Sequence, residues 1–143
     1  MDSVKTLDTV VTKQLKSAPE KVFDAWIDPG LVPHWFSPGL GEMVRVETDP
    51  RVGGIFRFDQ QRREGLARHW GTYLAVERPH RLSFTWCVDE HIEPDTVTID
   101  IAPAASGSIV TITHQMSAEF SGYAEQTASG WGTMLEGVRS IVE

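Results

Sequence analysis

The chain has 143 residues, of which 41% are hydrophobic and 23% are charged, and these proportions are typical of one globular domain with its own core. Twenty acidic residues against thirteen basic ones give a net charge of −7, which argues against a nucleic-acid partner because Lys and Arg supply most of that affinity. The single cysteine, Cys87, excludes an internal disulfide, and the chain has neither a secretory signal nor an apolar run of ~18 residues, so we expect one cytoplasmic domain over residues 1–143 without membrane insertion.

The first predicted elements are a strand and two short helices. Residues 7–16 mix β-branched and polar side chains, which is typical of a half-buried strand. Ser17 and Glu20 have the spacing of a capping box, and Pro19 is tolerated in a first helical turn. The helix that follows has an apolar stripe formed by Val22, Phe23, Trp26 and Ile27. A second short helix is expected over residues 31–36.

After Gly41 the apolar period changes from helical to alternating, which predicts strands. Six further strands are expected, over residues 43–48, 55–59, 66–76, 82–87, 97–101 and 110–114. In the second of these, Phe56 and Phe58 share one face of the strand. Arg57 and Asp59 alternate with them and should therefore face solvent.

The C-terminal segment, residues 119–143, returns to a helical period with an apolar stripe formed by Trp131, Met134, Leu135, Val138 and Val142. Four glycines lower its helix propensity, so its first turns should be irregular. The element order predicts an α+β fold, a curved seven-stranded antiparallel sheet around the long C-terminal helix, with two short helices after the first strand. One helix cannot fill such a sheet, so we expect an apolar hollow beneath it.

Side chains expected on the concave face of the sheet are candidates for ligand binding. His114 shares strand parity with Ile112 and should point into the hollow, where its ring could orient a ligand or act as a general acid or base. A core histidine satisfied by a backbone or helix partner is the alternative. The side chain of Trp70 fits either face of its strand. The full candidate set is Phe56, Phe58, Trp70, Tyr73, Phe84, Trp86, Ile99, Ile112, His114, Trp131, Met134 and Leu135.

Other polar groups are interpreted as structural. Asp49 should pair with Arg51 in a turn that contains glycines. The acidic run over residues 89–95 matches no compact metal-ligand spacing, and its carboxylates should be solvated. His34 should be exposed, and Cys87 should lie on the outer face of the sheet with no activated thiol. The sequence therefore predicts neither a metal site nor a cofactor.

Seven groups of residues stand in an order that is specific to one superfamily: Ala18-Pro19-Glu20-x-Val22-Phe23-x-Ala25-Trp26-x-Asp28-Pro29, Trp35, Asp49-x-Arg51-x-Gly53-Gly54-x-Phe56-Arg57-Phe58, Gly71-x-Tyr73, Pro79-x-Arg81-Leu82, Thr111-x-Thr113-His114 and Gly130-Trp131. In this order they resemble the START-like (SRPBCC) superfamily, and more narrowly the branch that shares a domain with activators of heat-shock protein 90 ATPase. The resemblance covers nearly the whole chain. It implies a helix-grip fold around a hydrophobic cavity.

The resemblance and the predicted hollow give three hypotheses for function. The first is a small hydrophobic ligand-binding protein, in which apolar contacts hold the ligand while His114 and Tyr73 orient its polar group. The second is an enzyme that uses the same cavity, such as a polyketide cyclase or aromatase, with His114 as the candidate catalytic residue. The third is a co-chaperone that stimulates the heat-shock protein 90 ATPase through an outer surface. Whether the chain forms a homodimer is left open.

Overall fold

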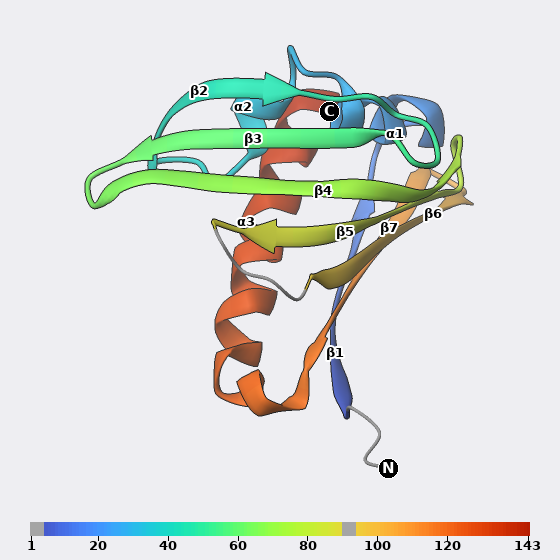
Figure 1. The fold of residues 1–143 in the computed structure, drawn as a ribbon. Coiled ribbons are helices and arrows are strands. Elements are labelled where there is room, and N and C mark those ends of the chain that lie inside the picture. The colour runs from blue at the N-terminus through green and yellow to red at the C-terminus, as the bar shows by residue number, and fades with distance from the viewer. Residues whose placement is uncertain (1–4, 90–93) are drawn as a thin grey trace.

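The computed structural model describes residues 5–89 and 94–143 (Figure 1). Its strands are β1 (Thr6–Leu15), β2 (Gly41–Glu47), β3 (Ile55–Arg62), β4 (Gly65–Glu77), β5 (Arg81–Val88), β6 (Asp95–Ala104) and β7 (Gly107–Ser117). Its helices are α1 (Pro19–Ile27), α2 (Val32–Trp35), the 3₁₀ helix η1 (Ala118–Tyr123) and α3 (Ala124–Val142). The predicted order of elements is confirmed.

The seven strands form one antiparallel sheet in the order β1-β7-β6-β5-β4-β3-β2. Strands β2 to β6 each pair with the next strand in the chain, whereas the last strand, β7, also pairs with β1. Figure 1 shows the sheet curving around α3, with α1 and α2 near the C-terminal end of that helix and η1 at its other end. This is the helix-grip arrangement that the sequence predicts.

The apolar stripe of α3 faces the sheet as predicted. Its buried residues are Trp131, Met134, Leu135, Val138 and Val142. The irregular start of the segment is also observed, because η1 precedes α3 and has non-helical backbone angles at Phe120. Gly137 lies against α2, where an added β-carbon would come within 2.9 Å of the Trp35 Cα atom. The missing side chain therefore lets the two helices approach closely.

The core is filled by aromatic rings. Helices α1 and α2 insert Trp26 and Trp35, and Phe36 follows α2 directly. The ring centroids lie 4.7 Å (Trp26 to Trp35) and 6.0 Å (Trp35 to Phe36) apart. Trp86 and Trp131 meet across the space between sheet and α3, at 5.3 Å. Only about 10 Å³ remains between these rings, about enough for one water molecule. The prediction of an apolar hollow beneath α3 is wrong, because α1 and α2 also cover the concave face.

The N-terminus of α1 differs from the prediction. The prediction of a capping box formed by Ser17 and Glu20 is wrong. Ala18 is the N-cap residue, and no side chain among the described residues caps the helix. The carbonyl of Ser17 instead accepts a hydrogen bond from the Ser108 hydroxyl on β7. Pro19 does lie in the first turn, as predicted. A hydrogen bond from β7 therefore fixes the junction between β1 and α1 in place of a side-chain cap.

Candidate functional site

An open cleft of about 340 Å³ lies on the concave side of the sheet at the η1 end of α3. The ends of three strands, η1 and the first turn of α3 form its walls. Its described lining residues are Trp86, Val88, Asp95, Met116, Phe120, Tyr123 and Thr127. Of these, Trp86 alone belongs to the set predicted from the sequence. The walls are mainly apolar and aromatic, with one carboxylate among them.

A chain of three side chains connects this cleft to the core. The Trp131 indole Nε1–H on α3 donates to Nδ1 of His114 over 2.8 Å. Because Nδ1 is an acceptor, the neutral ring carries its hydrogen on Nε2. Nε2 lies 2.8 Å from Oδ2 of Asp95 and donates to it. The hydrogen bond from α3 thus fixes the tautomer in which His114 holds the Asp95 carboxylate.

This geometry changes the role predicted for His114. The predicted orientation is confirmed, since the ring is on the concave face and is 4% exposed, and it has the helix partner that the alternative expected. Both ring nitrogens are occupied, so His114 has no free nitrogen to offer a ligand. The Asp95 side chain is 27% exposed and lines the cleft. Among the described lining residues, Asp95 is therefore the charged group that a bound molecule would meet.

The sequence interpretation missed Asp95 because it assigned the residue to a solvated acidic run. Asp95 is the first residue of β6, and it shares strand parity with Val97 and Ile99, which are buried on the concave face. That parity was the available signal. The expectation for residues 90–93 of the same run lies outside the described residues.

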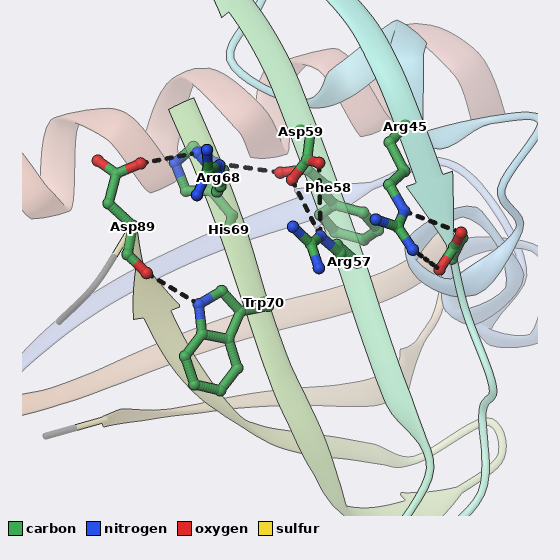
Figure 2. Close-up of polar contacts among 9 residues, drawn as sticks. Arg45, Arg57, Phe58, Asp59, Arg68, His69, Trp70 and Asp89 are labelled. Carbon is green, nitrogen blue, oxygen red and sulfur yellow. Dashed lines mark hydrogen bonds and ion pairs between the residues drawn. The ribbon is translucent and has the colours of Figure 1, made fainter. Parts of the chain in front are cut away.

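A second imidazole, missed by the sequence analysis, lies on the concave face. His69 is buried, with ring centroids 4.8 Å from Phe36 and 5.4 Å from Trp86. Its Nδ1 lies 3.4 Å from the carbonyl oxygen of Phe58 (Figure 2). Burial lowers the pKa of His69 from 6.5 to about 4, and the nearby Arg62 charge adds to the decrease. His69 is therefore neutral at physiological pH, and its ring packs against Trp86.

The other predicted ligand-binding side chains pack in the core. Five of them surround the small space beneath α3, namely Phe56, Phe58, Tyr73, Phe84 and Trp131. Ile99, Ile112, Met134 and Leu135 are also buried in the core cluster. Burial raises the pKa of the Tyr73 phenol, so this group stays protonated. The structure thus brings the predicted residues together as a packed core, with Trp86 at the border between core and cleft.

Trp70 lies on the opposite, convex face of the sheet (Figure 2). Its side chain is 39% exposed, and Nε1 donates to the backbone carbonyl of Asp89 over 3.1 Å. Because His69 faces the concave side, the next residue must point outward. Trp70 is in register with Arg57 on β3 and with Cys87 on β5. Its predicted place among the concave residues is therefore wrong.

The convex face also buries a carboxylate that was expected in solvent. Asp59 is 5% exposed, and its carboxylate lies 3.4 Å from the Arg57 guanidinium (Figure 2). Arg45 on β2 and Arg68 on β4 flank it in the strand register. Long arginine side chains can cover a neighbour of this size while their charged ends stay in water. The expectation that Asp59 faces solvent is wrong for this reason.

The expected pair of Asp49 with Arg51 and the expected places of His34 and Cys87 agree with the structure. Arg51 Nε lies 2.9 Å from the Asp49 carboxylate, and His34 is exposed. Cys87 shares the outer face with Trp70 but is buried, and burial raises the pKa of its thiol.

Within residues 5–89 and 94–143, no group of three His, Cys, Asp or Glu side chains gathers where it could hold a metal ion. No helix in these ranges has the length and apolarity needed to cross a membrane.

Comparison with known proteins identifies relatives of this fold. The sequence matches the family described as "Activator of Hsp90 ATPase homolog 1-like protein" over residues 16–143. The structure is similar to protein CV1439 from Chromobacterium violaceum, with a TM-score of 0.85 and 25% identity over 95% of this chain and 97% of that chain. It is also similar to the AHSA1-like protein from Aeromonas hydrophila, with a TM-score of 0.78 and 26% identity over 94% of this chain and 90% of that chain.

A third structure shows the same fold at lower identity. SA2116 from Staphylococcus aureus, a protein of unknown function, has a TM-score of 0.85 and 17% identity, over 97% of this chain and 94% of that chain. No match was found among the curated proteins. The family model therefore shows the family, and the solved structures show the fold.

Proposed function

Since this chain belongs to the Activator of Hsp90 ATPase homolog 1-like protein family, a branch of the START-like superfamily, we propose that it binds a small, mainly apolar molecule in the cleft at the η1 end of α3. The observation that carries the proposal is an open space with mainly apolar and aromatic walls on the concave side, next to a filled core. The cleft offers about 340 Å³, whereas the space beneath α3 offers about 10 Å³. Ligand pockets usually measure about 300–1,000 Å³, so the cleft suits a ligand of one or two rings.

The lining supports an apolar ligand with one polar group. Trp86, Met116 and Phe120 provide apolar and aromatic contacts from three different elements. Burying about 200 Å² of apolar ligand surface would contribute about 5 kcal/mol before the costs of association. Apolar contact alone should therefore give an affinity no tighter than about 0.2 mM. Asp95, held by His114, would orient the polar end of the ligand.

Native mass spectrometry of the freshly purified protein tests this proposal. We expect a bound small molecule, either one that co-purifies or an added naphthalene derivative, which the variant T127W should lose because the larger side chain fills the cleft. Thr133 lies on the exposed side of the same helix, so T133W is a matched control that should keep the molecule. Equal retention by both variants, or no bound molecule together with no binding of added naphthalene derivatives, would contradict the proposal.

The Asp95–His114 hydrogen bond favours a second function, enzymatic proton transfer. Two titratable groups lie within hydrogen-bond distance at the cleft, an arrangement that suits a general base. Asp95 would remove a proton from the carbon next to a ketone, as a cyclase or aromatase requires, and His114 would be a positioning residue. Deuterium exchange at the α-carbon of 2-tetralone, followed by NMR, tests this role. Faster exchange with wild type than with D95N is expected, and equal rates would contradict it.

The filled core favours a third function, binding to the heat-shock protein 90 chaperone, because surface binding needs no cavity. The test is the ATPase rate of the purified chaperone with and without this chain. A co-chaperone acting through its outer surface should stimulate the rate equally as wild type and as T127W. No stimulation by either protein would contradict this function.

A further inference from the structure

We propose that the cleft selects a ligand that carries a protonated amine, with the Asp95 carboxylate as its counter-ion. This inference rests on the proposed ligand-binding function and adds the chemical class of the ligand's polar end. The inference rests on the position of the Asp95 carboxylate, which a hydrogen bond from His114 fixes within a mainly apolar and aromatic wall.

The Asp95 carboxylate is held in place and keeps free acceptor capacity. Oδ2 accepts from His114 Nε2 over 2.8 Å, and a carboxylate has about four acceptor positions in total. The side chain is 27% exposed towards the cleft. Because Trp131 occupies Nδ1 of the same ring, His114 serves Asp95 as a donor. The group that this pair presents to the cleft is therefore the Asp95 carboxylate, a hydrogen-bond acceptor with negative charge.

The rest of the wall favours a cation over an anion. Among the described lining residues, none carries a positive charge, and Tyr123 and Thr127 add hydroxyl groups. Aromatic rings from Trp86, Phe120 and Tyr123 line the cleft, and the face of such a ring attracts a cation. A ligand carboxylate would instead meet the Asp95 charge with no basic side chain among the described residues of the wall to offset it.

The strength of the contact separates an amine from a neutral donor. A charge-assisted hydrogen bond is about twice as strong as a neutral one. We therefore expect an amine to bind about tenfold more tightly than an alcohol of the same shape. The net negative charge of the protein also attracts amines, but that attraction would not depend on Asp95 in particular. A carboxylate outside the cleft provides the control, and Asp100 on the same strand is half-buried and pairs with Arg81.

The test uses three naphthalene probes of one shape, 2-(aminomethyl)naphthalene, 2-(hydroxymethyl)naphthalene and 2-naphthoate, titrated calorimetrically into wild type, D95N and D100N. We expect the amine to bind best and 2-naphthoate worst. D95N should reduce amine affinity to that of the alcohol while keeping alcohol affinity, which also shows that the variant is folded. D100N should bind all three like wild type.

The outcomes separate this inference from the proposed function. Equal binding of amine and alcohol to wild type, or equal losses in D95N and D100N, would overturn the amine preference and leave the ligand-binding function standing. Failure of all three probes to bind would overturn both.

Discussion

Replacing His114 with Phe should destabilise the protein through the hydrogen bonds that the ring makes. His114 is 4% exposed and Trp131 is 3% exposed, so H114F leaves the indole N–H buried without its acceptor. An unpaired buried donor costs about 1–3 kcal/mol. The bond to Asp95 is worth about 1 kcal/mol, because water can reach the partly exposed carboxylate. We expect the free energy of unfolding to fall by about 2–4 kcal/mol.

A double-mutant cycle isolates the bond between the two side chains. W131F removes the donor and some ring volume, but in an H114F background it no longer breaks a hydrogen bond. The double variant should therefore lose less stability than the two single variants lose together, with a coupling energy of about 1–2 kcal/mol. Urea unfolding followed by far-UV circular dichroism measures each variant without depending on the fluorescence of the mutated indole.

Trp26 supplies the control for ring volume. It is also 3% exposed, and its Nε1 has no hydrogen-bond partner among the described residues. W26F should therefore remove similar volume without breaking a bond, and its effect should add to that of H114F within about 0.5 kcal/mol. Coupling between positions 114 and 131 that is no larger than this control would refute the proposed hydrogen-bond chain.

Two further predictions concern stability. The folded state favours neutral His69, whose pKa is lowered from 6.5 to about 4, so its contribution is complete above pH 6.5 and declines by about 3 kcal/mol as the pH falls to 4. Urea unfolding across this range should show a smaller pH dependence for H69F than for the wild type or for H34F at an exposed position, and identical slopes would contradict this. On α3, G132A should raise the free energy of unfolding by about 1 kcal/mol, since a β-carbon there meets nothing within 4 Å. G137A should lower it, because its β-carbon would press on Trp35, and shifts of the same sign would refute the packing argument.

Periodicity was sufficient to predict most of the fold. The α3 stripe was predictable because residues spaced three and four apart share a helix face, and all five of its predicted members are buried. The alternation of Phe56 and Phe58 likewise identified the concave face of β3. These features depend on local spacing, which the sequence contains directly.

The free space could not be predicted in the same way. It depends on how deeply Trp26, Trp35 and Phe36 enter the concave side, and their depth is set by the tertiary placement of α1 and α2. Asp95 was missed because it ends an acidic run, although its parity with Val97 indicates the concave face. The outward position of Trp70 became clear only from the strand register. Periodicity therefore identified the faces, whereas the volume between them required the three-dimensional packing.

Methyl NMR most directly tests the claim that the ligand binds in the cleft and not in the core. The chain has four methionines, of which Met116 lines the cleft and Met134 is buried in the core. Titration of ¹³C-methyl-Met protein with 2-(aminomethyl)naphthalene should shift the Met116 signal and leave the Met134 signal in place. A larger shift at Met134 than at Met116, or no shift at either methyl group, would contradict the account.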